Sequence, residues 1–290
     1  MSAAEFADYQ RRRARLSQAF AVVCLGATAF CVLVLVILLF EIFWQGLPLL
    51  NPRFLTSYPS RFADKAGIAP ALVSSLWLIV LTGLFTVPIG VGAALYLEEY
   101  APASRWRNLV QLNIANLAGV PSIMYGILGL GLFVRALALQ RSVLAGSLTL
   151  TLVVLPIVIL ASQESLRAVP DSIRRASYAL GATRWQTVWY QVLPAALPGI
   201  MTGVILALSR ALGEAAPLVA IAATFMTFIP ISPMDKFSAL PMQIFYWARR
   251  PEPEFHHVAA AGIVVLLTVL ILMNATAIYV RYHYGKKMRW

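Results

Sequence analysis

A charged pair interrupts an otherwise apolar stretch in the C-terminal part of the chain. Arg210 and Glu214 lie four residues apart, next to Ser209, and most of their neighbours are alanine, leucine, isoleucine and valine. At this spacing the two charged side chains share one face of a helix. A guanidinium group binds tetrahedral oxyanions through parallel N–H donors. These residues therefore indicate a polar path for an anion, in which Arg210 attracts the anion and Glu214 is its gate or counter-charge.

The depth of the pair in a membrane decides how unusual it is. If the helix enters the membrane near Pro198, a rise of about 1.5 Å per residue places Arg210 about 18 Å deep. That is just past the midplane of a hydrocarbon core about 30 Å thick, where an arginine costs about 2.5–3.5 kcal/mol on insertion scales. The alternative is a self-neutralised pair that faces neighbouring helices, or a helix end that lies closer to water.

A second polar feature is the connection between residues 163 and 194. Its charged residues lie among apolar ones and are Glu164, Arg167, Asp171, Arg174, Arg175 and Arg184. This mixture predicts short amphipathic helices, with Pro170 and Asp171 suited to a helix start and Gly181 to a break. The spacing leaves two interpretations open: a helix on the membrane surface, or a docking piece for a soluble partner.

The motifs of several enzyme classes do not occur in the sequence. It has no G-x-x-x-x-G-K-[ST] loop, no H-E-x-x-H stretch and no G-x-S-x-G elbow. A membrane-embedded enzyme acting on lipid therefore lacks a catalytic constellation, and we expect neither a metal nor a cofactor. If the chain serves an ATP-driven process, another polypeptide must bind the ATP.

The composition shows which elements must position these residues. Hydrophobic residues make up 60% and charged residues 12% of the 290 residues, and the mean hydropathy is +0.77. Soluble domains are roughly 45–50% apolar and about 25% charged, so a soluble enzyme, a disordered chain and a disulfide scaffold are disfavoured. The sequence predicts an all-α, polytopic integral membrane protein with six transmembrane helices near 18–44, 69–97, 110–134, 143–162, 195–217 and 257–280. The outer end of the fifth stays open because an apolar stretch continues from 218 to 229.

The cations predict the orientation of these helices. The formal net charge is +11, but the cations lie at the ends of apolar stretches, where they meet lipid headgroups, so we do not expect nucleic-acid binding. Placing the N-terminus inside assigns 14 of the 23 Lys and Arg residues to inner segments and 8 to outer ones. This bias predicts that both termini are cytoplasmic. The apolar run after Arg15 is about twice as long as a signal-peptide core and indicates a retained anchor.

The 163–194 connection resembles the EAA loop of type I ABC-importer permeases. In that family the pattern is E-A-A, three residues, G, nine residues and I-x-L-P, and the loop forms the coupling helix that docks onto the ATPase. Ala176, Gly181, Leu193 and Pro194 match the pattern, whereas Arg175 stands where Glu is usual. Ser177 and Gln191 replace the usual Ala and Ile. The resemblance implies that Arg175, Ala176, Gly181, Leu193 and Pro194 serve ATPase coupling.

Three longer strings narrow the resemblance to phosphate-import permeases of the PstA and PstC type. They are residues 96–102, 113–122 and 207–214. The similarity runs from about residue 68 to 283, and the short segment before the second span favours PstA over the sister PstC type. It implies that Arg210 and Glu214 correspond to charged residues involved in phosphate passage.

The resemblance also implies an architecture and a set of partners. Residues 1–67 would hold the N-terminal segment, first helix and outer loop, 68–283 the permease domain, and 284–290 a basic cytoplasmic tail. The partners would be a PstC-like permease, two PstB-like ATPase subunits and an extracytoplasmic PstS-like phosphate-binding protein, in a bacterial inner membrane. A permease for sulfate or molybdate, and a passive channel or scaffold that works without an ATPase, are the alternatives in transport.

Overall fold

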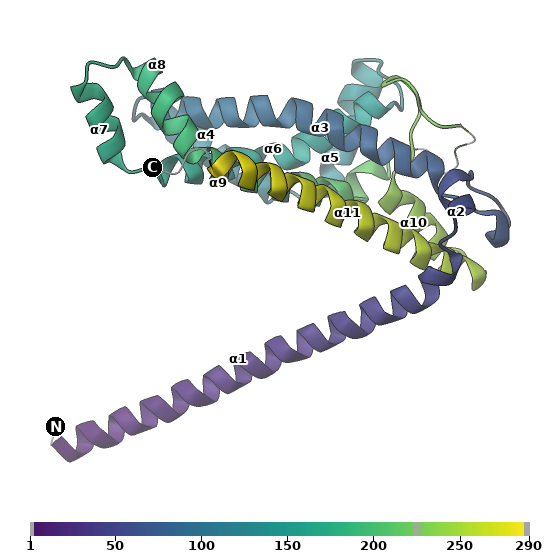
Figure 1. Ribbon diagram of the computed structural model, residues 1–290, viewed down its shortest axis with the longest axis horizontal. Coiled ribbons are helices and arrows are strands. Elements are labelled where there is room, and N and C mark those ends of the chain that lie inside the picture. The colour runs from purple at the N-terminus through teal and green to yellow at the C-terminus, as the bar shows by residue number, and fades with distance from the viewer. Residues whose placement is uncertain (1–2, 223–225, 227, 287–290) are drawn as a thin grey trace.

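The computed structural model describes residues 3–222, 226 and 228–286, and Figure 1 shows their arrangement. The α-helices are α1 (Ala3–Gly46), α2 (Pro52–Thr56), α3 (Ala69–Leu95), α4 (Arg105–Ala118), α5 (Ser122–Gly129), α6 (Val143–Arg167), α7 (Asp171–Ala179), α8 (Arg184–Thr187), α9 (Leu193–Gly213), α10 (Leu240–Ala248) and α11 (Glu254–Lys286). Three π-helical segments, Tyr96–Tyr100, Leu130–Ala136 and Val188–Val192, adjoin α3, α5 and α9. The described residues form no β-strand, and the protein is all-α as predicted.

Five helical segments are long and apolar enough to cross a membrane. They are Leu16–Leu49, Ala69–Tyr100, Val143–Arg167, Arg184–Gly213 and Glu254–His283, and they confirm five of the expected spans. A bent helix pair brings the number to six if the pair counts as one span. Hydropathy succeeds here because each window has enough apolar residues to span the hydrocarbon core.

The expected single helix over 110–134 is wrong. Arg105–Ala118 and Ser122–Ala136 meet at an angle of 100°, so this span is broken or re-entrant. The break falls at Gly119 and Pro121, because proline lacks an N–H donor and restricts the residue before it to extended conformations. The Tyr125 hydroxyl donates to the Leu117 carbonyl across the break, with an O–O distance of 2.7 Å. That bond satisfies a carbonyl at the C-terminal end of α4.

The fifth span ends earlier than residue 217. Helix α9 stops at Gly213, and Glu214 has φ −78° and ψ 110°, outside the helical region. The chain then packs inward, since Leu218 and Ile221 are buried in one cluster with Leu150 and Phe237. From 218 to 222 the apolar stretch therefore forms no long helix, and Leu218, Ile221 and Ala222 are buried whereas Val219 is exposed. Residues 223–225 and 227 of that stretch lie outside the described part, as do residues 287–290 of the expected basic tail.

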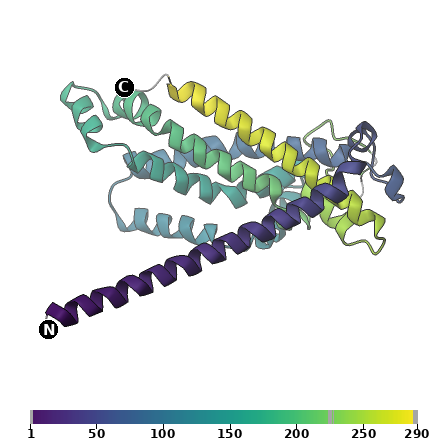
Figure 2. The same ribbon diagram turned by 60° about the horizontal axis from the view of Figure 1, so that its bottom comes forward.

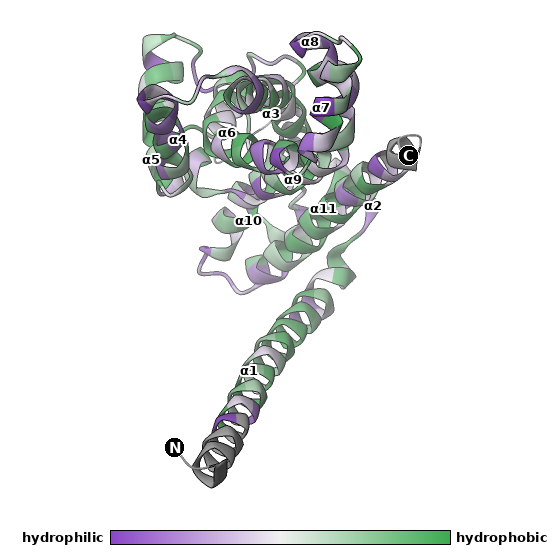
Figure 3. Cartoon of the chain, turned by 90° about the vertical axis from the view of Figure 1, so that its left-hand side faces the viewer, coloured by the Kyte–Doolittle hydropathy of each residue, from purple (hydrophilic) through white to green (hydrophobic). Residues whose placement is uncertain are grey.

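The long helices form a bundle from which one helix diverges. α3, α6 and α9 pack against one another, and α11 packs along α9. The N-terminal half of α1 stands apart from these helices in both views (Figures 1 and 2). In Figure 3 most of α1 beyond its start is coloured as hydrophobic, whereas α7 and α8 include hydrophilic residues.

The two ends of the bundle carry different elements. α7 and α8 lie at one end, and α2 and α10 lie at the other (Figure 1). α1 begins, and α11 ends, toward the end that carries α7 and α8. The short helices of the 163–194 connection are confirmed: Pro170 precedes α7, and Gly181 follows it with φ +82°.

Candidate functional site

The Arg210–Glu214 pair spans the C-terminal end of α9. Arg210 lies in the last turn, and its Nε is 3.3 Å from Glu214 Oε1. The expectation that the two side chains face each other is met, although Glu214 lies just beyond the helix rather than within it. The Arg210 side chain is 58% exposed and that of Glu214 is 17% exposed. The carboxylate is thus held by the protein, while most of the guanidinium stays accessible.

The packing of α9 shows where Arg210 lies along the bundle. Leu208 contacts Gly83 in the middle of α3, since a Cβ on that glycine would lie 3.4 Å from Leu208 Cδ1. Arg210 follows Leu208 by about half a helical turn. The guanidinium group therefore belongs to the middle of the bundle rather than to one of its ends.

The segments that follow the two helix breaks pack against each other. A Cβ on Gly126 of α5 would lie 2.5 Å from the Pro217 carbonyl oxygen, so only glycine lets these backbones approach. Irregular backbone at membrane depth is stable only where protein buries it or where it lines a water-filled cavity. Arg210 and Glu214 lie directly before the second of these irregular segments.

Ser209 does not join the ion pair. Its hydroxyl donates to the Ile205 carbonyl at 2.7 Å and forms a short hydrogen bond with the Asn274 side chain of α11. A second polar contact joins the same two helices, in which Arg281 Nη1 donates to Thr202 Oγ1 at 2.7 Å. Ser209 therefore serves the packing of α9 on α11 in this structure.

The expected coupling residues fall into two groups. Arg175 and Ala176 are exposed on α7, and Gly181 lies in the following turn, where a Cβ added to the glycine would have no other atom within 4 Å. Leu193 and Pro194 instead open α9, and Leu193 packs against a buried cluster that includes Val192. The first group lies on the surface, whereas Leu193 and Pro194 lie within the continuous helical segment Arg184–Gly213.

The surface around α7 and α8 is apolar as well as charged. Leu180 is 89% exposed, and Trp185 stacks on Trp189 with ring centroids 5.4 Å apart. Ser177 Oγ lies 2.8 Å from Thr187 Oγ1, which joins α7 to the end of α8. This end of the molecule thus offers a fixed, partly apolar face suited to a protein partner.

A family model covers most of this structure. Residues 86–290 match the family described as "Binding-protein-dependent transport system inner membrane component". The chain belongs to this family. Membership makes it a multi-pass membrane permease, the inner-membrane component of a binding-protein-dependent transport system.

Several relatives of this permease have been named. It is 32% identical over 232 residues to the phosphate transport system permease protein PstA 1 of Mycobacterium tuberculosis H37Rv, over 80% of this chain and 74% of the relative. It is 30% identical over 237 residues to PstA of Haemophilus influenzae, over 82% and 83% of the two chains. It is also 30% identical over 246 residues to the probable ABC transporter permease YqgI of Bacillus subtilis, over 80% and 84%.

Solved importers share the permease fold. An inward-facing MetNI methionine ABC transporter chain matches with a TM-score of 0.61 and 20% identity, over 74% of this chain and 96% of that one. A bacterial alginate importer chain matches with a TM-score of 0.60 and 14% identity, over 87% and 95%. At these identities the similarity establishes the type I importer permease fold.

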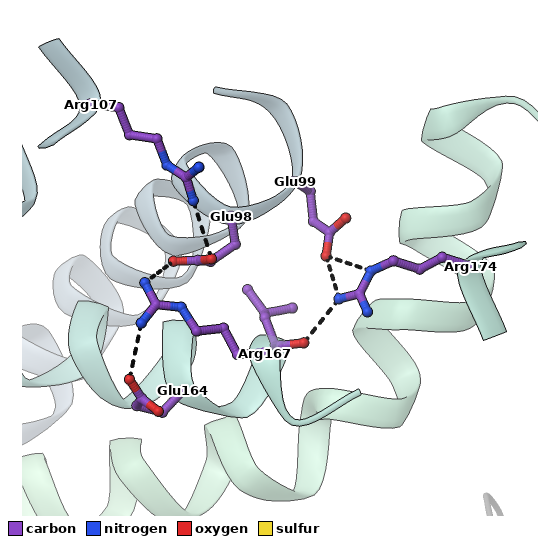
Figure 4. A network of polar contacts seen from close by, with 7 residues as sticks. Glu98, Glu99, Arg107, Glu164, Arg167 and Arg174 are labelled. Carbon is purple, nitrogen blue, oxygen red and sulfur yellow. Dashed lines mark hydrogen bonds and ion pairs between the residues drawn. The ribbon is translucent and has the colours of Figure 1, made fainter. Parts of the chain in front are cut away.

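One polar cluster of this permease was not predicted from its sequence. Glu98 and Glu99, at the end of α3, form ion pairs with Arg107, Arg167 and Arg174 (Figure 4). The two adjacent glutamates follow an apolar stretch directly, and this position could have indicated polar contacts at the end of the helix. Their partners could not be found by spacing, since Glu99 and Arg174 are 75 residues apart.

Proposed function

We propose that this permease is the PstA-type subunit of an ATP-driven importer of inorganic phosphate. Relatives named as phosphate permeases at 32% and 30% identity support the substrate. The observation that carries the proposal is Arg210: a guanidinium group that is 58% exposed, in the middle of the bundle and in the last turn of α9. Interrupted helices near the midplane are where transporters of several folds bind their substrates.

Arg210 is the proposed contact for the anion. Its planar donors match two oxygens of a tetrahedral oxyanion. Glu214 is its counter-charge while no anion is bound, with an Nε–Oε1 distance of 3.3 Å. An incoming anion must compete with this carboxylate, so binding stays weak enough for release, as conduction requires. Ser209 lines the pathway only if its contact with Asn274 opens.

The remaining parts of the proposal concern assembly and coupling. A PstC-like permease completes the pathway, two PstB-like ATPases bind the ATP, and a PstS-like protein delivers phosphate from outside. Arg175, Ala176 and Gly181 lie on the ATPase-facing surface, and Leu193 and Pro194 orient it. Both termini lie in the cytoplasm, which agrees with the position of the start of α1 and the end of α11 toward α7 and α8.

Phosphate uptake into vesicles tests this function. The vesicles hold this chain with its candidate permease partner, ATPase and binding protein, and labelled phosphate is offered with and without ATP. We expect ATP-dependent uptake that unlabelled phosphate blocks and that sulfate and molybdate do not. Displacement by sulfate or molybdate would keep the fold and change the substrate, and uptake without ATP would contradict the assignment to an ATP-driven importer.

A further inference from the structure

The inner end of α3 carries two adjacent carboxylates that are almost buried. Glu98 and Glu99 lie in the π-helical turn Tyr96–Tyr100, and their side chains are only 9% and 7% exposed. A buried carboxylate is costly unless ion pairs and hydrogen bonds compensate it. Each of these two carboxylates is compensated, but by different elements (Figure 4).

Glu99 pairs with the short helix α7. Its Oε1 lies 2.8 Å from Nη2 and 3.2 Å from Nε of Arg174, whose side chain is 17% exposed. Two donors of one guanidinium therefore converge on a single carboxylate oxygen. Charge-assisted bonds of this kind are the strong ones in proteins.

Arg174 also holds the end of α6. Its Nη1 donates to the Val169 carbonyl at 2.7 Å, and its Nη2 donates to the Leu166 carbonyl at 3.0 Å. The last carbonyls of a helix have no partners within the helix, so a cation here satisfies them and favours the helix C-terminus. One arginine thus joins three elements: α7, the end of α6 and the turn after α3.

Glu98 makes a separate connection. Its Oε1 lies 2.6 Å from Arg167 Nη2 on α6, and its Oε2 lies 3.4 Å from Arg107 Nη2 on α4. Within the described residues the Glu98 side chain forms ion pairs with Arg107 and Arg167 and none with a residue of α7. The neighbouring carboxylates are therefore alike in burial and differ in whether they hold α7.

The helices held by Arg174 lead to the middle of the bundle. α6 packs closely on α9, where Gly203 contacts Ala161 and a Cβ on Gly199 would lie 2.6 Å from Ser165 Oγ. α3 reaches α9 through Gly83 and Leu208. The two helices whose ends Arg174 and Glu99 join to α7 therefore both pack on α9, which carries Arg210.

We propose that Glu99 and Arg174 are positioning residues for coupling, which fasten α7 to the inner ends of α3 and α6 so that the three move as one body. This inference rests on the proposed ATP-driven import, in which the ATPase moves α7. Arg174 faces inward and the adjacent Arg175 is exposed, so the ion pair also fixes which face of α7 the ATPase meets. Removing the pair lets α7 move without carrying α3 and α6 along.

The test compares Glu99→Gln with Glu98→Gln in the assembled complex. Both variants remove one buried charge from the same turn, so they are matched for their cost to folding. For Glu99→Gln we expect the number of ATP molecules hydrolysed per phosphate imported to rise about tenfold, within the range by which positions between coupled sites alter coupling. For Glu98→Gln we expect this ratio to stay within about twofold of the unsubstituted complex. Equal ratios in the two variants would overturn the proposal.

A double variant separates the ion pair from its two members. If Glu99 and Arg174 act as a pair, Glu99→Gln with Arg174→Gln raises the ratio no further than Arg174→Gln alone, because the second substitution removes nothing new. If the double variant instead raised this ratio by the product of the two single-variant effects, the two residues would act independently and the proposal would be contradicted.

Hydrogen exchange of the complex provides a measurement that needs no substrate. In Glu99→Gln the amides of 171–180 should exchange at least about tenfold faster than in Glu98→Gln, because local opening of α7 becomes easier. If the exchange rates were unchanged, Glu99 would not fasten α7 to α3 and α6, even if phosphate import is established. If exchange became faster in a complex that imports no phosphate, the fastening of α7 by Glu99 would be supported and the proposed function would be refuted.

Discussion

Arg174 and Arg210 carry the same guanidinium group in two different settings. Arg174 is 17% exposed, and its donors reach Glu99, Asp171 and the carbonyls of Leu166 and Val169. Arg210 is 58% exposed, and within the described residues its guanidinium makes one ion pair, with Glu214. The first arginine is satisfied by the chain itself, whereas the second keeps donors free.

Under the proposed function, this difference separates an arginine that holds the structure together from one that contacts the anion. An arginine with all its donors engaged stabilises the packing of helix ends and has nothing left for a ligand. An arginine with free donors in the middle of a membrane bundle is costly and is retained where it serves a substrate path. The comparison therefore predicts that substitutions of Arg174 on α7 and of Arg210 at the C-terminal end of α9 fail in different ways.

The largest expected effect is at Arg210. Arg210→Gln should reduce phosphate uptake to background, because an uncharged amide cannot replace a guanidinium as the anion's contact. Uptake is measured in vesicles, and copurification of the partner chains shows that the complex is intact. Arg141→Gln, an exposed arginine before α6, is the matched control and should transport normally.

The next effect is expected at the turn after α7, on the surface where the ATPase is proposed to dock. Gly181 has φ +82° and no neighbours around it, so Gly181→Glu adds backbone strain and a charge without an internal clash. We expect less ATPase to copurify, or more ATP to be hydrolysed per phosphate imported. Ala182→Glu is the control, because it adds the same charge at the next residue, whose φ is not positive. A normal complex with normal coupling would count against docking at this turn.

A smaller effect is expected at Glu214. Glu214→Gln removes the carboxylate that competes with the anion for Arg210, so phosphate should be held more tightly and released more slowly. Initial uptake rates over a range of phosphate concentrations should reach half of their maximum at a lower concentration. The maximum rate should fall by about fivefold, since sites that bind too tightly conduct slowly. An unchanged curve would remove Glu214 from the path.

The smallest effect is expected in the loop that contains Asp235, away from α7 and α8. Backbone N–H groups of Ile231 and Ser232 both donate to Asp235 Oδ2 at 2.8 Å, and they lower the pKa of this carboxyl group below its usual value. Because the folded-state pKa is depressed, the stabilisation is present above the unfolded pKa of about 3.9 and is lost as the pH falls through the folded value. Asp235→Asn should speed amide exchange of 231–236 at neutral pH and change uptake by less than about twofold.

If Asp235→Asn instead abolished uptake, the loop would be part of the transport machinery and the contrast between the two arginines would be incomplete. Amides of 231–236 that exchange no faster in Asp235→Asn than in the unsubstituted protein at pH 7 would contradict the role assigned to the ionised carboxylate.

The sequence was sufficient for most of the spans and for the pair at Arg210. Apolar windows of about 20 residues identify spanning helices because the bilayer sets their length. The same windows missed the 100° bend after Ala118, since hydropathy reports composition and not direction. Pro121 was the available signal in the sequence.

Long-range polar contacts were beyond the sequence. The pairing of Glu99 with Arg174 joins residues 75 positions apart, and no local periodicity connects them. Ser209 was expected beside Arg210, but its rotation about α9 brings it to Asn274 on α11. In both cases the helix packing, which a single sequence does not encode locally, decides the partner.

The most direct test of this account measures ATP hydrolysed and phosphate imported in the same vesicles, for Arg210→Gln and Arg174→Gln side by side. The account predicts that Arg210→Gln retains its ATPase and hydrolyses ATP but imports no phosphate. Arg174→Gln should still import phosphate in preference to sulfate, with more ATP hydrolysed per phosphate. If Arg210→Gln imported phosphate at a near-normal rate, Arg210 would not lie on the pathway and the central claim would be wrong.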